Sequence, residues 1–274
     1  MRLKEVPASR GAHWVRAGFQ VFFRRPLVLT GLFAGFLFVT MLVSVLLPYV
    51  GGALALTLMP LLTLGFMKAT HVVLQGELPT ALVFVEPLQR NPARRKALIQ
   101  LGIAYGLTMV LAFTVSNWVA GDSSEAVRTA ATQGDATTPG FEVLMADPRW
   151  LSSMLVIMAL GAVLSIPFWH APALVYWGRQ GVGQSLFSST LAVWRARGAF
   201  MVYALAWMAV IVLFGLLTSV VFGLILGTPQ MLGIAALPGG LIFSTVFYAS
   251  LYFTFVDSFE TDSLTAIESV NRPG

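Results

Sequence analysis

The sequence predicts an all-α membrane protein with six transmembrane helices, arranged as three repeated units of an amphipathic interfacial helix followed by a transmembrane hairpin. Three observations lead to this prediction: six long apolar stretches, positive charge concentrated on one side of them, and a recurring order of features. The chain has 274 residues, of which 57% are hydrophobic and 11% charged, whereas a soluble domain carries about 25% charged residues. One membrane-embedded domain therefore accounts for nearly the whole length.

Each of the six stretches can cross a hydrocarbon layer of about 30 Å, since a helix rises about 1.5 Å per residue. They cover residues 27–47, 50–74, 97–119, 150–177, 199–226 and 234–256. We expect residues 1–26 to form a cytoplasmic amphipathic segment, 120–149 an extracytoplasmic loop and 257–274 a cytoplasmic tail. The first stretch begins too late and is too long for the apolar core of a cleaved signal peptide, so it is predicted to remain as the first span.

The distribution of Lys and Arg predicts the orientation. Of the 17 such residues, only Arg128 and Arg149 fall on one side of the spans, and the other fifteen fall on the opposite side. Because cytoplasmic loops of membrane proteins carry the excess of positive charge, both termini are predicted to lie in the cytoplasm. Lys68 lies late in the second span, where its stem can extend to the cytoplasmic headgroups.

A short amphipathic segment precedes each odd-numbered span, and this order indicates an internal threefold repeat. The segments are Ser9–Arg25, Thr80–Lys96 and Gln184–Arg197. On a helical wheel of the first segment, Trp14 and Phe22 share one arc, while Arg16 and Arg24 lie opposite. Such a helix lies flat in the inner interface with its apolar side among the acyl chains, or it packs against the spans as a belt. The sequence leaves both arrangements open.

The predicted partners are membrane lipids, with anionic headgroups favoured, because the basic residues stand beside the spans. Headgroup contacts are expected from Arg16, Arg24, Arg25, Arg94, Arg95, Lys96, Arg195 and Arg197. The same placement explains the net charge of +5 without nucleic acid. An unidentified membrane protein is a further candidate partner, and the oligomeric state is not predicted.

The densest local feature is the end of the fourth stretch, where Pro167 and Pro172 flank His170 and Trp169. The prolines free backbone carbonyls and bend the helix. An ionisable residue in a span is a functional candidate, yet His170 stands about 30 Å from Trp150 by helical rise, near the inner boundary. A structural role, with the ring reaching water or a freed carbonyl, is therefore favoured. His71, beside Lys68 in the second span, could share a cytoplasmic-side cavity with His170.

Motifs for catalysis and cofactors are missing from the sequence. No nucleotide-binding, hydrolase or metalloprotease motif is present, and the chain has no cysteine and three scattered histidines. We therefore expect no catalytic residue, no cofactor and no metal. The pairs Gly31–Gly35, Gly102–Gly106 and Gly223–Gly227 have G-x-x-x-G spacing, which favours close packing of the odd spans on one another within the molecule over contacts between copies.

The run Phe168-Trp-His-Ala-Pro-Ala-Leu-Val-Tyr-Trp177, together with residues 14–16, 25–33, 50–52 and 199–207, resembles a family of uncharacterised polytopic inner-membrane proteins of bacteria. The resemblance implies six spans and an inner-membrane location, and it implies no activity. The layout is more loosely similar to the membrane domains beside some glycerophosphodiester phosphodiesterases, from which no reaction is carried over.

Two functions of different kinds fit these features. The favoured hypothesis is a non-enzymatic membrane protein that organises lipid or supports a partner at the cytoplasmic interface. The alternative is a carrier or channel for a small or lipid-like solute, since proline-broken spans and repeats are common in transporters. Its lining would be Pro60, Pro167, His170, Pro172 and Pro238, with Tyr203 and Trp207 beside them. An intramembrane enzyme using His170 is a third hypothesis.

Overall fold

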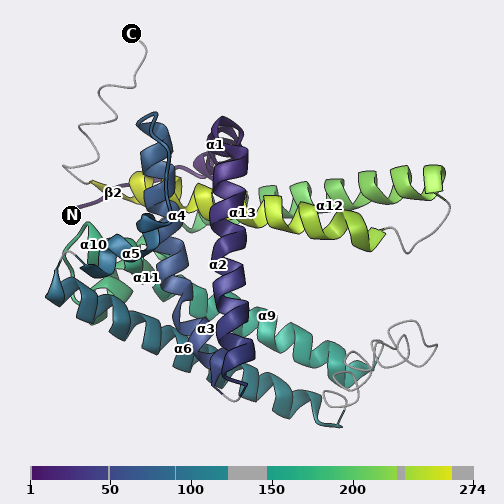
Figure 1. Ribbon diagram of the computed structural model, residues 1–274, viewed down its shortest axis with the longest axis horizontal. Helices are drawn as coiled ribbons and strands as arrows, with labels where there is room; N and C mark the ends of the chain where they lie inside the picture. Colours follow the sequence, from purple (N-terminus) through teal and green to yellow (C-terminus); the bar gives the residue numbers. More distant parts are fainter. Residues whose placement is uncertain (1, 49, 90, 123–146, 227–231, 261–274) are drawn as a thin grey trace.

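The computed structural model describes residues 2–48, 50–89, 91–122, 147–226 and 232–260, and these residues are almost entirely helical (Figure 1). Within these ranges, six helical segments are long and apolar enough to cross a membrane: Pro26–Leu46, Gly51–Leu74, Pro92–Ala120, Pro148–Tyr176, Arg197–Val221 and Leu237–Ser258. The predicted class, an all-α membrane protein with six spans, is confirmed.

The first hairpin follows an amphipathic helix and is interrupted once. Its elements are α1 (Arg10–Arg24), α2 (Pro26–Leu46), α3 (Gly51–Thr57) and α4 (Met59–Leu74). Pro26 and Pro60 each stand in the first turn of their helices, where a missing N–H costs nothing. The second span is therefore built from two consecutive helices that meet at Leu58.

The second amphipathic segment differs from the prediction. Residues 80–96 do not form one helix: α5 (Leu82–Gln89) is short, and α6 (Pro92–Ala120) begins five residues before the apolar stretch. The physical reason is the start signal at Asn91, whose side chain accepts hydrogen bonds from the backbone N–H groups of Ala93 (2.9 Å) and Arg94 (3.2 Å), with Pro92 next to it. The basic cluster of residues 94–96 thus belongs to the first turns of a span. The threefold repeat stays a prediction.

The fourth span bends at its prolines, as the sequence indicates. Helix α9 (Pro148–Phe168) ends before Trp169, and α10 (Ala171–Tyr176) begins after His170, with Pro172 in its first turn. Most of the 120–149 loop lies outside the described residues.

The last hairpin joins the end of the chain to its beginning. Its helices are α11 (Val182–Arg195), α12 (Arg197–Leu226) and α13 (Leu232–Ser258). After α13, strand β2 (Phe259–Glu260) pairs antiparallel with β1 (Arg2–Leu3), with Arg2 opposite Glu260. The beginning and the end of the described chain therefore lie side by side.

The long helices meet near the short helices α5, α10 and α11 and run from there in different directions. In Figure 1, α2 runs vertically, the α12–α13 pair extends sideways and the α6–α9 pair runs obliquely below them. Helix α1 packs on α12 and α13, and α4 also packs on α13. The core at this meeting point is aromatic: Trp14 contacts Phe200 and Tyr203, at ring-centroid distances of 5.2 and 5.8 Å.

Helix α1 settles the arrangement that the sequence left open. Trp14, Val15, Val21 and Phe22, on its apolar face, are buried in the protein core. The apolar arc therefore packs against the spans instead of entering the acyl region. The polar arc, with Arg16 and Arg24, is exposed.

The described glycine pairs do not pack the odd spans against one another. A Cβ added at Gly31 or Gly35 would meet nothing within 4 Å. Gly102 and Gly106 instead face Thr57 of the second span, where Gly106 would place a Cβ 2.6 Å from the threonine methyl group. These glycines therefore allow close packing between two neighbouring hairpins, since α6 of the second hairpin packs on α3 of the first. The pair Gly223–Gly227 extends outside the described residues.

Candidate functional site

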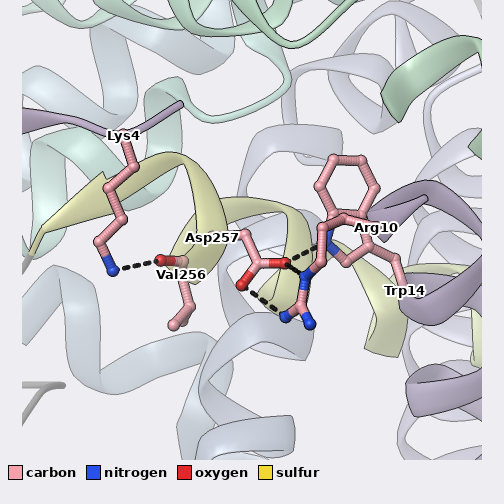
Figure 2. A network of polar contacts seen from close by, with 5 residues as sticks. All are labelled: Lys4, Arg10, Trp14, Val256 and Asp257. Atoms are coloured by element: carbon pink, nitrogen blue, oxygen red, sulfur yellow. Dashed lines mark hydrogen bonds and ion pairs between the residues drawn. The ribbon is translucent and has the colours of Figure 1, made fainter. Parts of the chain in front are cut away.

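The C-terminal half of α13 collects most of the polar contacts between helices, and we call residues 249–258 the α13 junction. Asp257 is its charged end (Figure 2). Arg10 donates two hydrogen bonds to its carboxylate, from Nε to Oδ2 (2.7 Å) and from Nη2 to Oδ1 (2.8 Å). Trp14 Nε1 donates a third to Oδ2 (2.6 Å). A bidentate guanidinium–carboxylate pair fixes orientation as well as distance, so Asp257 holds α1 against the end of the last span.

The N-terminal strand strengthens the same contact. Lys4 donates its backbone N–H to the Ser258 carbonyl (3.0 Å), and its ammonium group lies 3.4 Å from the Val256 carbonyl. Figure 2 shows Lys4 and Arg10 reaching α13 side by side. The last carbonyls of a helix favour positive charge, which is the physical reason why two basic residues end here.

His170 is fully buried at the junction. The sequence led us to expect that its ring reaches water or a freed carbonyl, but the ring does not reach water. Its Nε2 lies 3.2 Å from the Thr254 hydroxyl, which itself donates to the Leu251 carbonyl (2.8 Å). The hydroxyl proton is thus committed, so Nε2 carries the imidazole proton and donates it to Thr254. Trp169 Nε1 donates to the same oxygen (3.2 Å). The helix break between α9 and α10 is therefore tied to α13.

The break is supported from a second side. The backbone N–H of His170 donates to the Ser189 hydroxyl (3.0 Å), and Ser189 donates to the Ile166 carbonyl (2.9 Å). Bending at prolines leaves backbone groups without their helical partners, and a hydroxyl from α11 satisfies two of them here. The bend at His170 is therefore held by α11 as well as by α13.

Helices α4 and α12 reach the junction through separate hydrogen bonds. His71 Nδ1 lies 2.9 Å from the Tyr252 hydroxyl, and Thr70 donates to the Ala249 carbonyl (3.2 Å). Tyr203 of α12 bonds Ser250 (2.6 Å). His71 and His170 thus both bind α13, through different residues.

Lys68 is not free to extend to the headgroups. It is 8% exposed, its ammonium group contacts Glu86 of α5 (2.6 Å), and it lies 4.8 Å from the centre of the Tyr176 ring. Arg94 lies over the same ring, at 5.7 Å. A buried lysine needs such partners because desolvating a lone charge is costly. Lys68 therefore joins α4, α5 and α10, and sequence alone shows neither partner.

The lining predicted for a carrier does not come together. Pro172, Tyr203 and Trp207 are packed in the interior, whereas Pro238 is exposed on the surface. Pro167 is half-buried. Pro60 of this set lines a cavity between α4, α6, α9 and α13, with Trp169 beside it.

The other predicted headgroup residues remain at the surface. Arg16, Arg24, Arg25, Arg95, Lys96, Arg195 and Arg197 are exposed and Arg94 is half-buried. Partial burial, and then the charge of Arg10, lowers the pKa of His13 below its ordinary value of 6.5, so the basic surface at neutral pH consists of Lys and Arg. Within the described ranges, no three His, Asp or Glu side chains are placed to hold a metal ion.

Comparison with known proteins identifies the family. No family model and no solved structure matches the chain. A probable inner membrane protein of Burkholderia thailandensis is 32% identical over 262 residues, which is 93% of this chain and 93% of that protein. The chain belongs to the same family. With its six apolar helices it is a multi-pass inner-membrane protein, in agreement with the location that the resemblance implied.

Proposed function

We propose that this inner-membrane protein binds anionic lipid headgroups at its cytoplasmic face, and that it does so without catalysis. The observation that carries the proposal is the placement of its unpaired basic residues. Arg24 and Arg25 precede α2, Arg95 and Lys96 lie in the first turns of α6, and Arg195 and Arg197 flank the start of α12. Across the described part of the chain, the ion pairs formed are those of Arg10 and Lys68, so these six charges are available to phosphates.

Helix α11 supports the proposal with exposed aromatic residues beside its charges. Phe187 and Trp194, seven residues apart and therefore on one face, are 70% and 67% exposed. The Arg197 guanidinium lies 5.7 Å from the centre of the Trp194 ring. An exposed aromatic side chain next to a cation is typical of a helix at the boundary between headgroups and acyl chains. Helix α11 therefore keeps apolar surface for lipid.

The headgroup preference is testable by titrating the purified protein in neutral detergent with phosphatidylglycerol or phosphatidylcholine and counting bound lipids by native mass spectrometry. Phosphatidylglycerol is expected to bind more tightly, and its advantage should fall when salt rises from 0.1 to 0.5 M. Each Lys or Arg near an anionic surface contributes about 1 kcal/mol, so R195Q with R197Q should weaken phosphatidylglycerol binding by about thirtyfold.

The matched control is R149Q, which removes an exposed arginine at the opposite end of the spans. It should leave the preference unchanged. Equal affinity for the two lipids at low salt, or equal losses in R149Q and in the double variant, would contradict the proposal.

We also propose that the face carrying these charges is cytoplasmic. The β1–β2 pairing joins both ends of the described chain, and the charge bias supports the cytoplasmic side. Because the chain has no cysteine, single cysteines report topology cleanly. In intact cells with a permeabilised outer membrane, D122C is expected to react with an impermeant maleimide, whereas Q184C should react only after lysis. The reverse pattern would invert the orientation.

A further inference from the structure

The cavity between α4, α6, α9 and α13 has features of a ligand site that the headgroup proposal does not use. It has a volume of about 130 Å³ and is partly open. Its walls include Pro60 and Thr63 of α4, Tyr105 of α6, Phe168 of α9 and Tyr248 of α13. Tyr105 lies near the middle of its helix, away from the basic residues in the first turns of α6.

The lining is uncharged and offers hydrogen-bond donors. No Lys, Arg, Asp or Glu contributes to it. Thr63 donates to the Met59 carbonyl (3.3 Å) and Ser165 to the Ala162 carbonyl (2.8 Å). The hydroxyls of Tyr105 and Tyr248 form no hydrogen bond with any residue of the described ranges. A donor left unmet in an apolar environment costs free energy, so these two hydroxyls favour a ligand that carries an acceptor oxygen.

The size limits which part of a ligand fits. An engineered apolar cavity of about 150 Å³ holds one benzene molecule, so 130 Å³ accommodates a ring or a short chain segment with its oxygen. A phosphate headgroup with its counter-charges does not fit such a lining, because nothing in it neutralises a phosphate.

A second feature provides room for a longer chain. A more open apolar groove of about 620 Å³ runs along α2, α3 and α4, lined by Leu37, Phe38, Met41 and Leu56 among others. Met59 lines both the groove and the cavity. An alkyl chain in the groove would therefore place its polar end at Met59, next to the cavity. Thr40 and Ser44 in the groove donate to carbonyls of their own helix, which leaves its surface apolar in character.

We propose that the cavity and groove together bind an uncharged long-chain lipid, of the diacylglycerol or long-chain alcohol class, with its oxygen at Tyr105 and Tyr248 and its chain past Met59. This site is independent of the headgroup surface. It also gives a lipid-like solute a place among the spans that differs from the predicted proline lining.

The test uses the full chain in nanodiscs with a diacylglycerol whose acyl chain carries a diazirine. After irradiation, peptide mapping is expected to find label on Met59 to Thr63 and on residues 241–251. Unlabelled diacylglycerol should compete, and phosphatidylglycerol should not. Y105F with Y248F keeps the shape of the cavity and removes both donors. Because two hydrogen bonds of about 0.5–1.5 kcal/mol each are lost, the double variant should need about tenfold more probe than the wild type for half-maximal labelling.

T63W fills the cavity and should abolish this label, while T114W, on an exposed part of α6, should not. The melting temperature of each variant identifies any that fails to fold. If T63W does not fold, the labelling of the Y105F, Y248F double variant tests the proposal. Label confined to exposed faces such as Leu155 and Met158, equal labelling of wild type and the double variant, or equal competition by phosphatidylglycerol would overturn the proposal. Phosphatidylglycerol binding in the same preparations reports on the headgroup proposal separately.

Discussion

Replacing Asp257 with alanine is expected to lower the free energy of unfolding by about 2–4 kcal/mol. The change removes the acceptor of three charge-assisted hydrogen bonds, each contributing about 1.5–3 kcal/mol. The effect is not their sum, because Arg10 is 39% exposed in its side chain and regains water. Trp14 is fully buried and loses the partner of its indole N–H. Unfolding in mixed micelles of dodecyl maltoside and increasing SDS, followed by tryptophan fluorescence, measures the difference.

Two variants separate the contact from a general effect of lost charge. D257N keeps an acceptor for Trp14 but weakens the Arg10 pair, so its loss should lie between those of wild type and D257A. E260Q removes a carboxylate three residues away, on the exposed end of β2, and should unfold like the wild type. If D257A were as stable as E260Q, Asp257 would not hold α1 in place.

Adding a methyl group at Gly11 or Gly18 is expected to displace α1 from α12 and α13. A Cβ at Gly11 would overlap the Ala199 carbonyl oxygen and stand 2.6 Å from the Tyr203 backbone nitrogen. At Gly18 it would stand 2.7 Å from Ser250 Cβ. Backbone atoms cannot rotate away, so G11A and G18A should each cost about 1–3 kcal/mol, as overpacked substitutions do.

G35A is the matched control, because a Cβ there meets nothing within 4 Å. Alanine is preferred over glycine inside a helix by about 0.5–1 kcal/mol, so G35A should be unchanged or slightly stabilised. Melting temperatures in detergent compare the three variants. Equal melting temperatures for G11A and G35A would contradict the close approach of α1.

The spans could be predicted from sequence because their signal is local. Hydropathy over about 20 residues fixes the length of a helix in the bilayer, and the proline positions marked the interruptions at residues 58–60 and 169–172. The boundary that moved, the start of α6, depends on a single capping residue, Asn91, which lies in a polar stretch without hydropathy contrast. Local capping chemistry thus overrides the apolar pattern at one end of a span.

The α13 junction could not be predicted, because its partners are distant in sequence. Asp257 is an acid at the end of the last span, but nothing local shows that Arg10, 247 residues earlier, binds it. The partners of the two histidines, Tyr252 and Thr254, read as ordinary residues of an apolar helix. An amphipathic wheel also looks alike whether lipid or protein covers its apolar arc, so burial of Trp14 needed the structure.

The strand pairing of Arg2–Leu3 with Phe259–Glu260 has a consequence for biosynthesis. Residues 2–3 acquire their partners only when residues 259–260 emerge from the ribosome, after the six described spans have been made. Until α12 and α13 have been made, Trp14 lacks the rings of Phe200 and Tyr203 and the Asp257 carboxylate, and the inner leaflet is the nearest apolar environment for that face. Closing such a long loop comes late in folding, so a chain that stops before α13 would leave its first helix without the Asp257 contacts that hold it against the last span.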